Sequence, residues 1–199
     1  MTGNGPAGGS GASGRRPPLL VTAELPPDVL GWADALRRAH YPAERNRLRA
    51  HVTLFHALPP TVEEELREVL GTLAAQPAPQ ASISGLMKLG HGTALAVDCP
   101  AMVALHAEIA ERMHGLLTRQ DAQPLRLHIT IQNKVTAEAA RALQQQLGPT
   151  LRPVSFRFHA SDSMPGKKAY GVPSGTTRFE ADGLRMVAEE GLEPPTRGL

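Results

Sequence analysis

The sequence predicts an α+β protein made of two pseudo-symmetric lobes, each a mainly antiparallel sheet with helices outside, that face each other across a central cleft. Three observations predict this class. Strand-like and helix-like segments alternate along the chain, the order strand, helix, strand, helix, strand occurs twice, and a His-x-Thr pattern lies in the third segment of each half. The 199 residues, 41% of them hydrophobic, suit one domain. We expect it to span 18–182, between disordered tails at 1–17 and 183–199.

The first half contains three strand patterns and two helix patterns. Residues 26–40 carry apolar side chains at helical spacing, and Thr61 with Glu64 forms a capping-box pair that opens a helix reaching about residue 75. The strand patterns combine β-branched and apolar residues with alternation. They lie at 18–25, 48–58 and 80–89.

The second half repeats this order. A helix pattern covers 100–118, and Thr136 opens a second helix that reaches about residue 147. Strand patterns lie at 92–99, 125–135 and 153–160. Beyond residue 160 the chain is rich in turn residues, and we expect at most one short strand there, near 176–181.

Composition excludes several classes of protein. The Gly-rich start lacks the apolar region of a signal peptide, and no apolar run approaches the roughly 18 residues of a membrane span. The single cysteine, Cys99, excludes an intramolecular disulfide and a Cys-based zinc site. A net charge of +2 gives no general basis for binding nucleic acid or membrane. We expect a cytoplasmic monomer without a membrane partner.

The two His-x-Thr patterns carry the chemistry. Because side chains alternate along a strand, His51 and Thr53 share one face, and so do His128 and Thr130, while the apolar residues between them mark the core. Two facing lobes would bring both pairs into one cleft. A neutral imidazole then accepts a proton from the attacking group, a protonated one donates to the leaving oxygen, and the hydroxyls bind the non-bridging phosphate oxygens. This chemistry needs no metal and no cofactor.

Other interpretations stay open at this stage. A lone strand histidine is most often structural, and a metal site would need acidic or cysteine partners that neither motif has beside it. Lys134 either reaches a phosphate or is a solvated strand end. On strict alternation Phe55 and Gln132 share the faces of His51 and His128, whereas His56 faces the core as a structural residue. Loop arginines are further candidates to bind flanking phosphates: Arg45, Arg47, Arg119 and Arg126.

These residues resemble the two-histidine phosphoesterase superfamily, and in particular its bacterial 2'-5' RNA ligase-like, or cyclic phosphodiesterase, branch. The resemblance rests on "HVTLF" at 51–55 and "HITIQNKV" at 128–135, and it extends over about 18–147. It implies metal-independent chemistry on 2',3'-cyclic phosphates or 2'-5'-linked ribonucleotides, with RNA or a nucleotide as substrate. It also implies that His51 and His128 are the catalytic histidines and that Thr53 and Thr130 bind phosphate, and we add Lys134 as a candidate.

The chain departs from the family near its end. Members usually finish with a strand pair that carries an aromatic residue followed by Gly-Gly-Pro-Trp, and residues 159–180 do not match this pattern. The departure predicts that the C-terminal strand is altered or lost, which would leave an incomplete sheet edge. The alternative function is therefore a nucleotide- or RNA-end-binding protein that uses the same cleft without turnover. The near-equivalent motifs leave open which histidine is the acid.

Overall fold

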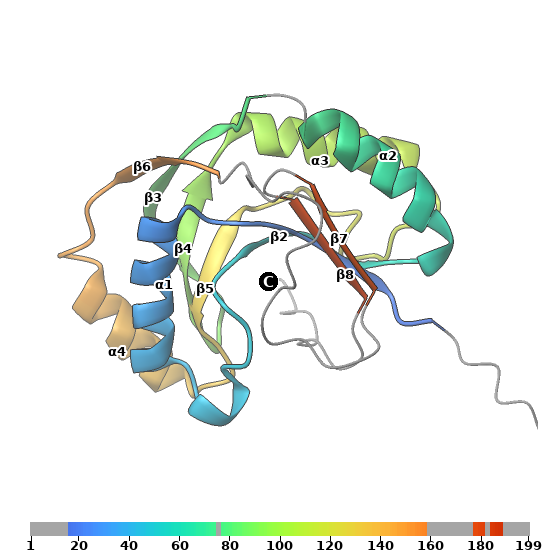
Figure 1. Ribbon diagram of the computed structural model, residues 1–199. Helices are drawn as coiled ribbons and strands as arrows, with labels where there is room; N and C mark the ends of the chain where they lie inside the picture. The colour runs from blue at the N-terminus through green and yellow to red at the C-terminus, as the bar shows by residue number, and fades with distance from the viewer. Residues whose placement is uncertain (1–15, 75–76, 159–176, 182–183, 189–199) are drawn as a thin grey trace, which may run out of the picture.

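The computed structural model describes residues 16–74, 77–158, 177–181 and 184–188, and it shows an α+β fold with one antiparallel sheet. The helices are α1 (Pro27–His40), α2 (Glu63–Ala74), α3 (Pro100–Arg112) and α4 (Ala137–Leu147), with 3₁₀ turns at Ala43–Arg45 and Pro60–Val62. The strands are β1 (Leu19–Ala23), β2 (Val52–Leu58), β3 (Gln80–Lys88), β4 (Thr93–Asp98), β5 (His128–Gln132), β6 (Val154–Arg157), β7 (Thr177–Ala181) and β8 (Leu184–Ala188). Figure 1 shows α1 and α4 together along one side of the strands, and α2 and α3 together along another.

Local signals account for these elements. Pro27 at the first helical position begins α1, and the hydroxyl oxygen of Thr136 accepts the backbone N–H of Ala139 at 3.2 Å, so Thr136 caps α4 as its sequence predicts. Thr61 differs from the prediction, because it lies inside the 3₁₀ turn before α2. Helix α3 ends at Arg112, earlier than predicted, and Gly115 follows with a positive φ of 79° that only glycine adopts without strain.

The strand order is β6-β3-β4-β5-β2-β1-β8-β7, which divides into two four-stranded halves that meet where β2 pairs with β5. This grouping differs from the predicted one, because 80–89 was placed in the first half. In the structure β3 pairs with β4 and β6, both of the second half. The β3–β4 connection is a tight hairpin turn at Gly90, whose φ is 68°. A short hairpin makes β3 and β4 neighbours irrespective of the repeat in the sequence.

The C-terminal segment completes the first half of the sheet. We predicted at most one short strand after residue 160 and an altered or lost C-terminal strand, yet the chain forms both β7 and β8. All five residues of β8 pair with β1, from Leu184 opposite Ala23 to Ala188 opposite Leu19. The predicted domain end at residue 182 therefore falls between two paired strands, and 184–188 belong to the sheet. Of the predicted tails, residues 1–15, 183 and 189–199 lie outside the described residues.

The core lies between the sheet and the helices. Fully buried side chains from β2, α2, β4 and β5 form one apolar cluster, and at one edge of it the rings of Phe156 and Phe158 meet edge to face at 5.2 Å. Helix α1 packs against β5, and the buried Arg37 donates from Nη1 to the carbonyl oxygen of Thr130 at 2.8 Å. The first half thus helps to fix β5, the strand of the second half that carries its motif. Within the described ranges no helix combines the length and the apolar character needed to span a bilayer.

Candidate active site

The register between β2 and β5 brings the two His-x-Thr motifs together. Val52 lies opposite Ile129 in an antiparallel pair, so the neighbouring positions pair crosswise: His51 faces Thr130, and Thr53 faces His128. Val52 and Ile129 are fully buried, and the four motif side chains, which are partly exposed, point to the opposite face. The structure therefore gathers on one face the two histidines and two threonines that the sequence singled out, with each histidine beside the threonine of the other half.

Both imidazole rings are held in the same way. Nδ1 of His51 lies 2.8 Å from the carbonyl oxygen of Arg49, and Nδ1 of His128 lies 2.7 Å from that of Arg126. A carbonyl oxygen only accepts hydrogen bonds, so each Nδ1 carries a hydrogen and donates it. In the neutral ring the lone pair is consequently on Nε2. Each motif thus fixes its own tautomer through the backbone two residues earlier.

The surroundings of His128 favour its neutral form. Burial lowers the pKa of the imidazole below its ordinary value of 6.5; the hydrogen bond to the Arg126 carbonyl raises it in part, and the positive charges of His56 and Arg126 lower it again. The net pKa of His128 is lowered. An unprotonated His128 at neutral pH is suited to accept a proton.

A β-bulge follows the threonine of each motif. Along β2, Thr53 lies opposite Thr22 and Phe55 lies opposite Val21, so Leu54 is an extra residue. Along β5, Thr130 lies opposite Ala94 and Gln132 lies opposite Thr93, so Ile131 is an extra residue in the same place. An extra residue shifts the alternation of side chains by one position. The faces predicted for Phe55 and His56 on β2 and for Gln132 on β5 are therefore reversed. A second register shift, between Phe55 and Leu58, returns Leu58 to the core as predicted.

The bulges correct three predicted orientations. Phe55, predicted on the His51 face, is completely buried and stacks on His106 of α3, with ring centroids 4.4 Å apart. Gln132, predicted on the His128 face, is buried and accepts the hydroxyl of Thr93 at 3.3 Å. His56, predicted to face the core, has a side chain that is 29% exposed. The shifted alternation turns His56 to the face of His51 and Thr53.

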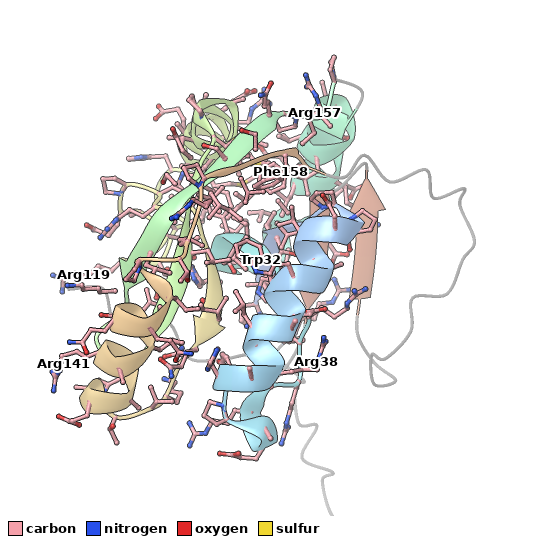
Figure 2. All side chains as sticks on the ribbon, turned by 90° about the vertical axis from the view of Figure 1, so that its left-hand side faces the viewer. Trp32, Arg38, Arg119, Arg141, Arg157 and Phe158 are labelled. Carbon is pink, nitrogen blue, oxygen red and sulfur yellow. The ribbon has the colours of Figure 1, made fainter. Side chains whose placement is uncertain are left out.

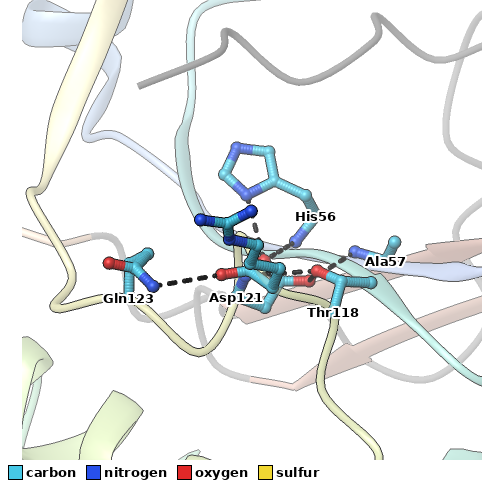
Figure 3. A network of polar contacts seen from close by, with 6 residues as sticks. His56, Ala57, Thr118, Asp121 and Gln123 are labelled. Atoms are coloured by element: carbon cyan, nitrogen blue, oxygen red, sulfur yellow. Dashed lines mark hydrogen bonds and ion pairs between the residues drawn. The ribbon is translucent and has the colours of Figure 1, made fainter. Parts of the chain in front are cut away.

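A buried carboxylate holds His56. Nδ1 of His56 lies 3.1 Å from Oδ1 of Asp121, and the two carboxylate oxygens also accept the backbone N–H groups of His56 and Ala57 and the hydroxyl of Thr118, at 2.8, 3.0 and 3.1 Å (Figure 3). Burial by itself raises the pKa of Asp121, but the hydrogen bonds and charge of His56 and the N–H of Ala57 outweigh it and leave the pKa lowered. Asp121 is thus an ionised, almost fully enclosed carboxylate that orients a third imidazole.

Sequence reasoning missed this pair for identifiable reasons. Asp121 lies between α3 and β5 in a segment without periodicity, and His56 acquires its orientation only through the bulge. A buried carboxylate that pairs with a strand histidine leaves no local pattern. The nearest signal is the hydroxyl–carboxylate spacing of Thr118 and Asp121, in which each residue bonds the other across three positions.

The other predicted cationic residues are exposed. Lys134 follows β5 with a left-handed φ of 58° and an exposed side chain, and its role in binding phosphate stays a prediction. Arg45 and Arg47 are exposed on the segment before β2, and Arg119 points outward from the molecule (Figure 2). Arg126 is exposed and close enough to act on the charge of His128. Among the described residues, no three His, Cys, Asp or Glu side chains gather as metal ligands would.

The chain matches one family profile and resembles several solved structures. Residues 25–162 match the sequence profile of the 2'-5' RNA ligase superfamily, and this range includes both motifs. Among solved structures, one described as a phosphoesterase is 18% identical over 72% of this chain and 84% of its own, with a TM-score of 0.43. Escherichia coli LigT in its apo form is 15% identical over 72% and 83%, with a TM-score of 0.42. No curated protein matches the chain.

Proposed function

The chain belongs to the 2'-5' RNA ligase superfamily, and from this premise we propose that it is a metal-independent phosphodiesterase or RNA ligase-like enzyme acting on 2',3'-cyclic phosphates or 2'-5'-linked ribonucleotides. The observation that carries the proposal is the pairing of Val52 with Ile129, which sets His51 opposite Thr130 and His128 opposite Thr53 on one partly exposed face. Two imidazoles with matched tautomers and two hydroxyls supply an acid, a base and donors for phosphate oxygens.

For a 2',3'-cyclic phosphate the proposed steps are as follows. A water molecule attacks the phosphorus while one imidazole accepts its proton at Nε2. The bond from phosphorus to the 3'-oxygen breaks, and the other imidazole donates its Nε2 proton to that oxygen, which leaves a 2'-phosphate and a free 3'-hydroxyl. The hydroxyls of Thr53 and Thr130 donate to the non-bridging oxygens as negative charge grows on them. Ligation to a 2'-5' bond is the same chemistry with a ribose hydroxyl in place of water.

The two histidines receive different roles in this scheme. His128 has a lowered pKa, so its neutral form predominates at pH 7 and it serves as the base in hydrolysis. His51 then serves as the acid. In the reverse direction the roles exchange, because the same protons move back along the same path.

The acid limb of the pH profile tests this assignment. Protonation of the base abolishes activity, so kcat/KM should rise with pH through the pKa of His128, with a midpoint below the ordinary value of 6.5. The measurement is kcat/KM for a cyclic nucleotide across the range from acidic to neutral pH at constant ionic strength. A midpoint at or above 6.5 would contradict the assignment of His128 as base.

Turnover of a simple substrate tests the function itself. Purified protein in EDTA is expected to convert nucleoside 2',3'-cyclic monophosphates to nucleoside 2'-phosphates, identified by phosphorus NMR. A product with the phosphate on the 3'-oxygen would refute the proposed leaving group. Binding of a 2'-phosphorylated oligonucleotide by a folded protein that turns over neither cyclic phosphates nor 2'-5' linkages would instead support a binding protein that uses the same face.

A further inference from the structure

The two halves of the site are related by a pseudo-twofold axis through the Val52–Ile129 pair, and this symmetry extends beyond the motifs. Because the bulges after Thr53 and Thr130 fall in the same place, "HVTLF" at 51–55 corresponds position by position to "HITIQ" at 128–132. His56 and Asn133 are the next residues, so they hold equivalent places in the sequence of the two motifs. Two positions before the histidines, Arg49 is equivalent to Arg126, and both contribute the carbonyl that holds the motif ring.

At the His51 end the charged and polar groups are already satisfied. Nε of Arg49 lies 3.1 Å from the carboxylate of Asp34, whose second oxygen accepts the backbone N–H of Ala50 at 2.7 Å. Asn133 is buried, and its side-chain oxygen accepts the backbone N–H of Lys134 at 2.8 Å. At the His51 end the charge of Arg49 is therefore balanced by Asp34, and the side-chain amide of Asn133 is buried.

At the His128 end the equivalent groups differ in charge and exposure. His56 is an imidazole in place of the amide, with Nδ1 bonded to Asp121 and the opposite side of the ring directed away from that carboxylate (Figure 3). Arg126 is exposed, and in the described part of the chain its guanidinium has no carboxylate partner such as Arg49 has in Asp34. Both groups lie close enough to His128 for their positive charge to act on it. The His128 end of the site therefore carries positive charge that the His51 end lacks.

We propose that His56 and Arg126 bind a second phosphate of the substrate, beside the reacting phosphate on the His128 side of the site. Asp121 is the positioning residue of this subsite: its carboxylate accepts Nδ1–H of His56 and so directs Nε2, the second donor of an imidazolium ring, to a phosphate oxygen, while Arg126 adds a permanent charge. The inference rests on the proposed function and narrows its substrate class. It favours an oligonucleotide that carries an internal phosphate next to its terminal cyclic phosphate over a mononucleotide.

A comparison of three substrates measures the contribution of the second phosphate to kcat/KM. The first is a nucleoside 2',3'-cyclic monophosphate, the second is a dinucleotide that ends in the same cyclic phosphate, and the third is that dinucleotide with an uncharged methylphosphonate linkage. The wild-type protein should prefer the charged dinucleotide over the mononucleotide by about tenfold in kcat/KM, mainly through a lower KM, since a charge-assisted contact contributes about one such factor. The methylphosphonate dinucleotide should behave like the mononucleotide.

In His56→Gln and in Arg126→Gln, the ratio of kcat/KM for the charged dinucleotide to kcat/KM for the mononucleotide should fall toward one. Arg49→Gln, the change at the pseudo-equivalent position, should leave the ratio as it is in the wild type, because Asp34 already balances that charge. Thermal unfolding of each variant checks that it is folded. An equal loss on charged dinucleotide and mononucleotide in His56→Gln or Arg126→Gln would overturn the subsite and leave the proposed function standing.

A wild-type protein without turnover would refute the proposed function separately. The subsite then has a second readout, which is the calorimetric affinity for the corresponding 2'-phosphate mononucleotide and dinucleotide. Tighter binding of the dinucleotide that is lost in both glutamine variants would support the subsite. Equal affinities for the two ligands in the wild type would overturn it.

Discussion

Replacement of either motif histidine by alanine should lower kcat/KM on a cyclic phosphate by about 10³-fold, because general acid and base catalysis each contribute about 10²–10⁴. In the proposed mechanism His51→Ala removes the group that protonates the leaving oxygen, and His128→Ala removes the group that activates the water. The measurement is steady-state hydrolysis with product quantified by chromatography. Neither ring belongs to the buried core, so both variants should fold and unfold as the wild type does.

The matched control is His114→Ala, which changes an exposed histidine just beyond α3 and should retain full activity. The double variant of His51 and His128 should lose little more than either single variant, because residues that act as a unit are not additive. Retention of more than a tenth of the wild-type kcat/KM in either single variant would contradict paired-histidine catalysis.

The largest effect on stability is expected at Asp121. Asp121→Ala leaves the backbone N–H groups of His56 and Ala57 without their acceptor and removes the partners of the His56 ring and the Thr118 hydroxyl. Since each buried group that loses its partner costs about 1–3 kcal/mol, the free energy of unfolding should fall by about 3 kcal/mol or more. Urea unfolding followed by circular dichroism measures this change. Asp98→Ala, at an exposed carboxylate at the end of β4, should change the stability by less than about 0.5 kcal/mol.

The contribution of the Asp121 carboxylate to the stability of the protein depends on pH. The pKa of Asp121 is lower in the folded protein than its ordinary value of 3.8, so its stabilising contribution is fully present above that value and is lost as pH falls through the lowered pKa. The difference in stability between wild type and Asp121→Ala should therefore be constant near neutral pH and shrink in strong acid. A difference that is absent at neutral pH would show that Asp121 does not stabilise the β2 backbone.

Much of the fold could be predicted from local patterns. The α+β class, the order of the elements through 157 and the placement of both motifs on strands follow from periodicity and from caps such as Thr136, which act over a few residues. The gathering of the motifs was predicted from their repetition alone. It depends on the one registered pair between β2 and β5, which the structure supplies.

The remaining features depend on contacts between distant segments. Nothing in the sequence marks Leu54 and Ile131 as bulged residues, so Phe55, Gln132 and His56 were assigned to the wrong faces. The strand pattern at 80–89 was correct, but a strand pattern does not specify a partner. Likewise β8, which was predicted to lie in a disordered tail, pairs with β1 along five residues, and the sequence of 184–188 alone does not specify that partner.

The crosswise pairing at the centre of the sheet makes the site sensitive to the register between β2 and β5. Within the sheet the halves meet at one registered pair, and each motif histidine lies opposite a threonine of the other half. A slip of one residue along this seam would turn one motif away from the common face, and a slip of two would separate both histidines from their hydroxyls at once. In the proposed mechanism neither half is active by itself, so the activity should be all-or-none and should report on the docking of the two halves during folding.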